Sequence, residues 1–229
     1  MMNITVEKIL ERPDAKLLMD KVNYFLSAEY QKRMAFREWL DEDKKAECHP
    51  AEFINGEVIM HSPVKRKHWK ASTLLSRILG VHASLNDLGE VAIEKALIAL
   101  TRNDYEPDIC FWLNEKTKGF SNDQMIFPAP DFVVEILSRS TAKNDRTIKH
   151  QDYAAHGIRE YWIIDPNRQL IDQFILIGND TEYMPAKTHL ISQDIKSFVI
   201  EGFEIPVVAV FDKQINKTTL LELMKPKQG

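Results

Sequence analysis

The sequence predicts an α/β domain preceded by a helical extension. Over residues 14–45, apolar side chains recur at the three- and four-residue intervals of a helix, without glycine or proline. Short apolar runs at 109–113, 132–137 and 161–164 have the length of buried strands. A helical segment separates the last two runs, and strand, helix, strand over this distance is typical of a crossover unit in an α/β sheet.

The N-terminal extension, residues 1–47, is expected to be separate from a main domain spanning 48–229. Leu18, Val22 and Phe25 lie on one side of its predicted helix, which either continues through Ser27 or breaks there. The opposite side is dense with charge, so the apolar side needs a partner. We expect it to pack onto the domain or onto a second copy of the chain, which would make a homodimer.

The first part of the main domain predicts a hairpin, a helix and a strand. Asn55-Gly56 stands between two short β-prone runs, and this pair tolerates the positive φ angles of a tight hairpin. Apolar residues at helical intervals predict a helix over 64–84. Gly89 ends the connection, and a β segment is expected over 90–100.

The second part of the domain begins with the helix of the crossover unit, 142–156. Thr141 is its candidate N-cap and Gly157 its candidate C-terminal stop. After the turn Asp165-Pro166-Asn167, a further strand is expected at 170–177, followed by an apolar run and a short terminal helix, at 205–211 and 220–224.

The composition is that of an ordinary folded domain, with 44% hydrophobic and 28% charged residues. No stretch approaches the roughly 20 apolar residues of a membrane span, and the start lacks the apolar segment of a secretory signal, so we expect a cytoplasmic protein. Cys48 and Cys110 are far apart and have no CxxC partner, which predicts buried free thiols instead of a disulfide or a zinc site.

The charge pattern neither requires nor excludes nucleic acid. A net charge of −4 argues against a protein that coats nucleic acid, because such binding is driven by lysine and arginine. Two local basic runs could still contact phosphates or could simply be solvated: Lys65, Arg66, Lys67, His68 and Lys70 form the first, and Arg139, Lys143, Arg146, Lys149 and His150 the second.

Two carboxylates carry the chemical prediction. Glu135 stands in the middle of an apolar strand, where an ionised carboxylate is costly unless it is paired, protonated or bound to a metal ion. Asp108 follows Glu106-Pro107 at the start of another strand. A hard cation such as Mg²⁺ takes one or two carboxylates, and the carbonyl of Ile136 could add a third ligand. Such a site suits phosphodiester hydrolysis.

Structural explanations compete with these functional ones. Glu135 could form a buried ion pair with Arg139 or Lys149, and Asp108 could simply end a strand beside Pro107. Lys149 follows Asp145 by four residues, which is the usual arrangement of a surface helix pair worth about 0.2–0.5 kcal/mol.

The motif from Pro130 onward, PDFVVEILSRST, continues with Asp145, Lys149, Tyr153, Gly157 and the run EYWIIDP. Together with EPDICF and FINGEVIMHSP upstream, it closely resembles the Uma family of restriction-endonuclease-like proteins in the PD-(D/E)XK nuclease superfamily. The resemblance covers roughly residues 51–211 and leaves most of the N-terminal helical segment outside. It implies a restriction-endonuclease-like core, in which helices flank a mixed β-sheet.

The resemblance also implies a site and an activity. Asp108 and Glu135 would bind Mg²⁺ or Mn²⁺, and Lys149 would replace the usual strand lysine, whose position is held by Leu137. Glu57 and His68 match further recurrent positions and would complete the metal site or contact substrate. The expected function is a metal-dependent endonuclease acting on nucleic acid, with DNA as the expected substrate. The alternative is a catalytically silent module that binds nucleic acid or protein. Tyr153 would orient the lysine.

Overall fold

A computed structural model describes residues 5–40, 51–93 and 96–225. Within them, a six-stranded mixed sheet has the strand order β11-β10-β9-β8-β6-β3. β8 and β9 are parallel and are joined through a helical segment, so the predicted crossover unit is confirmed. The other neighbouring strands are antiparallel. The strands are β3 (Gly89–Ile93), β6 (Ile109–Leu113), β8 (Phe132–Ile136), β9 (Glu160–Asp165), β10 (Leu170–Ile175) and β11 (Lys187–Leu190).

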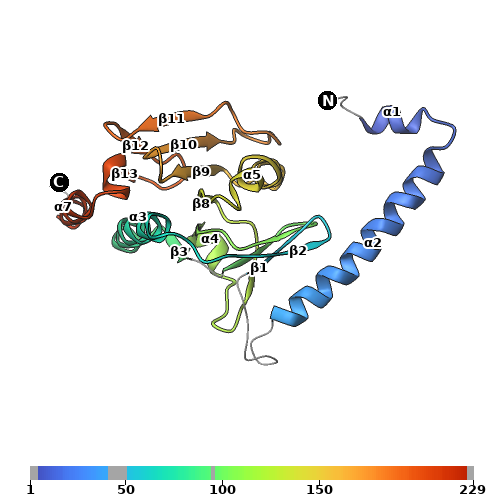
Figure 1. Ribbon diagram of the computed structural model, residues 1–229, viewed down its shortest axis with the longest axis horizontal. Helices are drawn as coiled ribbons and strands as arrows, with labels where there is room; N and C mark the ends of the chain where they lie inside the picture. The colour runs from blue at the N-terminus through green and yellow to red at the C-terminus, as the bar shows by residue number, and fades with distance from the viewer. Residues whose placement is uncertain (1–4, 41–50, 94–95, 226–229) are drawn as a thin grey trace.

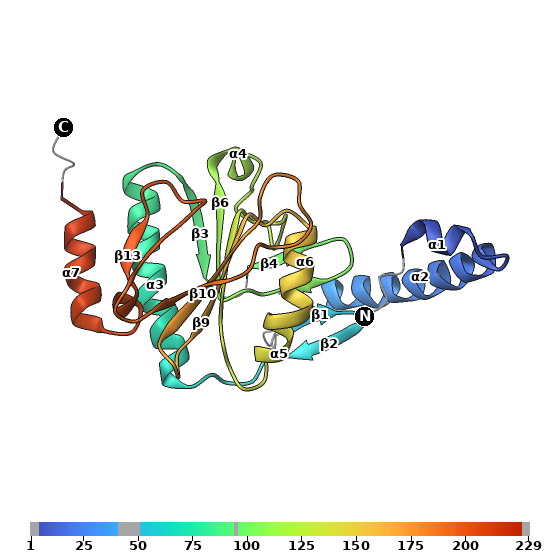
Figure 2. The same ribbon diagram turned by 90° about the horizontal axis from the view of Figure 1, so that it is seen from above.

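Helices cover both faces of this sheet, as Figures 1 and 2 show. α3 (Arg66–Leu85) and α7 (Lys213–Leu223) lie on one face, and α5 (Ala142–Asn144) and α6 (His150–Ala155) on the other. The strands alternate accordingly, because successive side chains point to opposite faces. Phe132 and Trp162 pack on the α3 side, with ring centroids 5.1 Å apart. Val133 and Tyr161 pack on the α6 side.

A second, five-stranded sheet has the order β2-β1-β5-β4-β7. The predicted hairpin is confirmed, since Asn55 and Gly56 have φ angles of 51° and 86° between its two strands. The strand predicted at 90–100 is instead two strands, β3 and β4, in different sheets. The strands of the second sheet are β1 (Ala51–Ile54), β2 (Glu57–Met60), β4 (Leu97–Ala99), β5 (Asp104–Tyr105) and β7 (Ile126–Phe127).

The C-terminal segment, from β12 onward, packs on the face of the six-stranded sheet that α3 covers. The apolar run predicted at 205–211 enters the core as the end of β13 and a 3₁₀ turn. α7 begins earlier than the predicted terminal helix, because the Asp212 side chain caps it by accepting hydrogen bonds from the amides of Gln214 and Ile215. The remaining elements are α4 (Asn114–Thr117), β12 (Asp194–Lys196), β13 (Glu204–Pro206) and the 3₁₀ turn (Val207–Val210).

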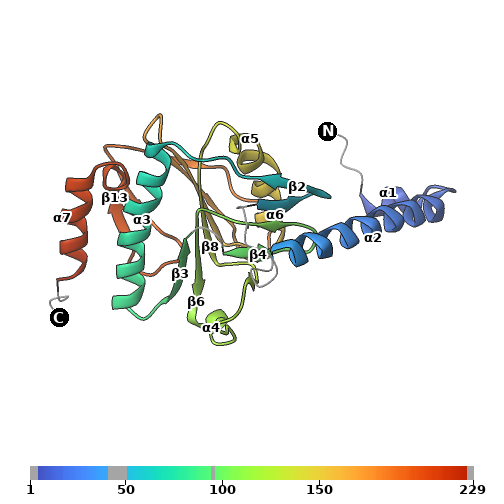
Figure 3. The same cartoon turned by 60° about the horizontal axis from the view of Figure 1, so that its bottom comes forward.

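The N-terminal extension contains α1 (Val6–Leu10) and α2 (Ala15–Leu40), which projects from the domain (Figure 3). α2 runs through Ser27 without interruption, so a break there is excluded. Its C-terminal half is docked on the domain, where Phe36 and Leu40 pack with Phe53 of the hairpin. The rest of the predicted helix to residue 45, the domain boundary at 47/48 and Cys48 lie outside the described residues. Cys110 is buried as predicted.

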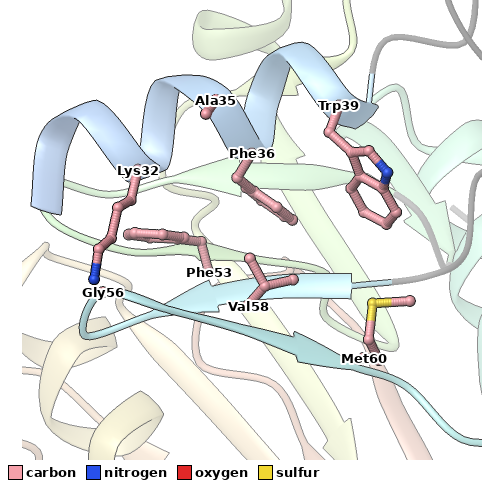
Figure 4. Close-up of a pocket in the computed structure, with 8 residues that line it drawn as sticks. All are labelled: Lys32, Ala35, Phe36, Trp39, Phe53, Gly56, Val58 and Met60. Atoms are coloured by element: carbon pink, nitrogen blue, oxygen red, sulfur yellow. The ribbon is translucent and has the colours of Figure 1, made fainter.

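Buried charge fixes the docked end of α2. Asp104 is fully buried and accepts hydrogen bonds from the guanidinium groups of both Arg33 and Arg37. Beside this anchor, an apolar cavity of about 440 Å³ lies between α2 and the hairpin, lined by Phe36, Trp39 and Val58 among others (Figure 4). In the described part of the chain, none of the helices has the length and apolar character needed to cross a bilayer.

Candidate functional site

Asp108 and Glu135 come together where β6 and β8 pair. Ile109 lies opposite Val134 in this antiparallel ladder, which places Asp108 across from Glu135 on the neighbouring strand. Asp108 Oδ2 accepts a 2.7 Å hydrogen bond from the amide of Ile136. The two carboxylates line a cavity of about 50 Å³, which is large enough for more than one water molecule. The structure therefore brings the two carboxylates together at one cavity.

Lys149 reaches this cavity from the crossover segment. Its Nζ lies 2.9 Å from Glu135 Oε1, 2.7 Å from Glu52 Oε1 and 3.5 Å from Asp145 Oδ1. The side chain is only 1% exposed. The interpretation of Lys149 and Asp145 as a surface helix pair is therefore wrong. The buried ion pair weighed for Glu135 is present, and its partner is Lys149.

The local helix geometry explains how Lys149 and Asp145 both point inward. The predicted helix 142–156 contains one π-helical turn, Asp145–Lys149, between α5 and α6. Such a wide turn changes which side chains face the sheet, and π-turns often lie at functional sites. Thr141 does not act as a side-chain cap; instead, its amide donates to Ser138 Oγ. Gly157, with a φ angle of 73°, ends α6 as predicted.

Three buried carboxyl groups surround the one ammonium group of Lys149. Burial raises the pKa of Glu135 well above its usual value, although Lys149 opposes this, and Asp145 and Asp108 raise it further. Burial also raises the pKa of Asp145, although Lys149 and Thr141 oppose this. Burial alone would lower the pKa of Lys149, but Glu135 and Glu52 outweigh it and raise that pKa well above its usual value. Lys149 is therefore a permanent cation at neutral pH.

Glu52 is a member of the site that the sequence analysis missed. It is 2% exposed on β1, and burial opposes its ionisation, but Lys149 and His61 outweigh that effect and lower its pKa. His61 Nε2 lies 3.4 Å from Glu52 Oε2. Like Glu135, Glu52 is a glutamate inside an apolar, β-prone run, and this pattern could have identified it from the sequence.

The other predicted residues have different positions. His68 is buried on α3, with Nε2 3.4 Å from Asp108 Oδ2, so it joins the site. Tyr153 donates a 2.8 Å hydrogen bond to Glu135 Oε1, and so orients the glutamate instead of the lysine. Glu57 is exposed on β2 and does not line the cavity, so it does not complete the metal site there. Ile136 meets Asp108 through its amide, and the carbonyl contact stays a prediction.

The donor set fits a hard divalent cation. Asp108 and Glu135 offer carboxylate oxygens at one cavity, and the surplus of buried carboxylates over the single ammonium of Lys149 favours added positive charge. In residues 5–40, 51–93 and 96–225, no three His, Cys, Asp or Glu side chains already converge on one point. This is compatible with Mg²⁺, which usually takes one or two carboxylates and keeps several waters.

A protein-family model decides the affiliation of the chain. The model of the Uma2 family, described as "Putative restriction endonuclease", matches residues 35–208. The chain belongs to the Uma2 family. The match begins in the docked end of α2 and includes every residue placed at the cavity, whereas the projecting part of α2 lies outside it.

Two further proteins are similar to this Uma2 chain. A crystal structure described as "a putative nuclease belonging to DUF820", from Anabaena variabilis, has a TM-score of 0.63 at 17% identity and covers 79% of this chain and 97% of its own. This likeness confirms the mixed α/β fold with helices flanking the sheet. An uncharacterized protein from Synechocystis sp., sll1609, is 26% identical over 144 residues, which are 62% of this chain and 80% of that protein.

Proposed function

We propose that this chain is a metal-dependent endonuclease that hydrolyses phosphodiester bonds of nucleic acid, with DNA as its substrate. The observation that carries the proposal is the meeting of Asp108 and Glu135 at one cavity, with Lys149 bonded to Glu135. Membership of the Uma2 family supports the same class of reaction.

Each side chain has a role in this proposal. Asp108 and Glu135 would hold Mg²⁺ or Mn²⁺, which when bound polarises a phosphodiester and stabilises the departing oxygen. Tyr153 and Lys149 hold the Glu135 carboxylate in place through the same oxygen, Oε1. Because Lys149 stays protonated at neutral pH, it supplies positive charge toward the phosphate and does not take up a proton. His68 positions Asp108.

A cleavage assay tests the proposal. Purified protein is incubated with DNA, and separately with RNA, in Mg²⁺ or Mn²⁺. Glu135→Gln should lower cleavage by more than about 100-fold, the upper range for residues that only support a metal ligand. Glu57→Gln makes the same chemical change on an exposed glutamate and should cut normally. Equal cutting by Glu135→Gln, or no cutting by the wild type on any substrate, would refute the nuclease.

The alternative is a catalytically silent module on the same fold, and calorimetry separates the two. The nuclease predicts Mn²⁺ binding that is lost in Asp108→Ala. Absence of metal binding in the wild type, together with intact DNA affinity, would favour the silent module.

We also propose that the projecting helices of two copies pair to form a homodimer. Leu17, Tyr24 and Phe25 on α2 are 65%, 72% and 68% exposed, which is unusual for large apolar side chains on one helix. α2 has 26 residues and is about 39 Å long, and its N-terminal part projects away from the domain (Figure 3). We infer that the same helix of a second copy covers these apolar side chains. Light scattering should give twice the chain mass, and Phe25→Glu should give a monomer. A monomeric wild type at micromolar concentration contradicts the pairing.

A further inference from the structure

A groove of about 590 Å³ lies beside the carboxylate cavity. Its walls come from three segments that are distant in sequence: residues 62–68, which lead into α3, residues 137–142 after β8, and residues 165–167 after β9. Ser62, His68, Ser138 and Ser140 line both the groove and the cavity. The groove therefore opens onto the side of the site where Asp108 and Glu135 lie.

The groove concentrates positive charge in a protein of net charge −4. Lys65, Lys67 and Arg139 line it and are exposed, and in the described part of the chain none of the three pairs with a carboxylate. Asp165 is the one acidic residue in the lining, and its Oδ1 is occupied by the amides of Asn167 and Arg168. The lining therefore contains three cationic side chains and one carboxylate, which already accepts hydrogen bonds from its own turn.

The shape of the groove is fixed by contacts across it. The Lys67 ammonium donates to Asn167 Oδ1, which ties the start of α3 to the turn after β9. In the segment after β8, Ser138 Oγ lies 3.0 Å from both Ser140 Oγ and Thr141 Oγ1. The N-terminus of α3 adds partial positive charge, and its first turn contains no acidic residue that would offset this charge. Cations and hydroxyls on a preformed wall are the groups that contact nucleic-acid phosphates.

We propose that this groove binds the sugar–phosphate backbone of the nucleic acid, with Lys65, Lys67 and Arg139 as its phosphate contacts. The inference rests on the proposed nuclease function and adds the path by which the strand reaches the site. It also resolves an electrostatic conflict. The buried carboxylates around Lys149 repel phosphate, so a flanking row of cations is needed to hold the backbone next to them.

The test measures how binding depends on salt. A fluorescein-labelled DNA oligonucleotide, single-stranded or duplex, is titrated by anisotropy at several KCl concentrations with EDTA present, so that nothing is cut. Each of Lys65→Ala, Lys67→Ala and Arg139→Ala should reduce the slope of log K against log[KCl] by about 0.7–0.9. Each should weaken binding about fivefold at moderate salt, as expected for one lost phosphate contact.

Lys118→Ala is the matched control, because Lys118 is exposed beyond β6, at the end of the strand away from Asp108, and lies outside the groove lining. It should leave slope and affinity unchanged. The inference is overturned if the triple groove variant keeps the wild-type slope, or if the wild type binds no oligonucleotide. The nuclease proposal fails separately: a wild type that binds through the groove but never cuts keeps the inference and refutes the nuclease.

Discussion

At the scale of single residues, Lys149 holds the buried charges together. It forms ion pairs with both Glu135 and Glu52 and lies near Asp145, and all four side chains are almost fully buried. Lys149→Met keeps the bulk of the side chain but leaves these carboxylates without a cation. We expect the free energy of unfolding to fall by roughly 3–5 kcal/mol, the usual cost of breaking a buried pair from one side.

Urea denaturation at neutral pH measures this loss. Lys118→Met, the same change at an exposed position, should shift the midpoint little. Adding Glu135→Gln to Lys149→Met should recover part of the stability, because one uncompensated carboxylate is removed. An unchanged midpoint in Lys149→Met would contradict the charge balance described above.

His150 predicts part of the dependence of stability on pH. Its ring lies 4.7 Å from that of Phe174 and 5.2 Å from that of Tyr183, and burial lowers its pKa from the usual 6.5. The unfolded chain therefore binds this proton more readily than the folded one. The contribution of His150 to stability is complete above about pH 6.5 and declines as the pH falls through its lowered pKa.

A pH series of urea denaturations compares the wild type with His150→Gln. The variant loses ring packing at every pH but has no imidazole to protonate, so the stability difference between the two proteins should shrink as the pH falls below 6.5. A difference that stays constant over that range would mean that His150 does not titrate differently on folding.

The site could be predicted only where a residue conflicts with its sequence neighbours. Glu135 conflicts with its apolar strand, and this conflict identified it. Glu52 is in the same conflict, but its apolar run is only four residues long and leads into a hairpin. The inward position of Asp145 and Lys149 depends on a π-helical turn, and a spacing of four residues does not distinguish it from a surface pair. Glu57 was predicted at the site, but its exposed position on β2 could not be derived from the sequence pattern.

At the scale of elements, one buried carboxylate strengthens the attachment of α2 to the domain. Asp104 pairs with Arg33 and Arg37, and both arginines are more than three-quarters buried. Asp104→Ala removes the partner of both cations. We expect a loss of roughly 3–5 kcal/mol and faster amide hydrogen exchange over the last turns of α2, because this contact fixes them to the domain.

Arg102→Ala is the control for this prediction. It breaks the ion pair between Arg102 and Glu29, also between α2 and the domain, but Arg102 is 47% exposed. An exposed pair contributes about 0–1 kcal/mol, so exchange in α2 should change little. Equal effects of the two variants would show that burial does not determine the strength of this attachment.

The elements themselves were predictable to different degrees. The hairpin, α3 and the strands β6, β8 and β9 follow from turn chemistry and apolar runs, and all are confirmed. The second sheet was missed because β5 and β7 have two residues each, too few for a pattern. The start of α7 was missed because its signal is the single cap Asp212 and not an apolar repeat.

At the scale of the whole molecule, the candidate site lies where two sheets and the crossover helix meet. β1 of the five-stranded sheet contributes Glu52, β8 of the six-stranded sheet contributes Glu135, and the π-helical turn contributes Lys149. The sequence predicted the α/β class and the crossover because those depend on local patterns. It could not predict that β1 packs against the crossover helix, since that contact joins segments about one hundred residues apart.

The central claim is that Asp108 and Glu135 together hold a divalent cation. Crystals soaked in Mn²⁺ test it most directly, because the anomalous signal of the ion locates it without reference to activity. We predict one strong peak in the cavity, within coordination distance of Asp108 and Glu135, that disappears in Glu135→Gln crystals. An empty cavity at saturating Mn²⁺, or a peak bound by other side chains, would contradict the claim.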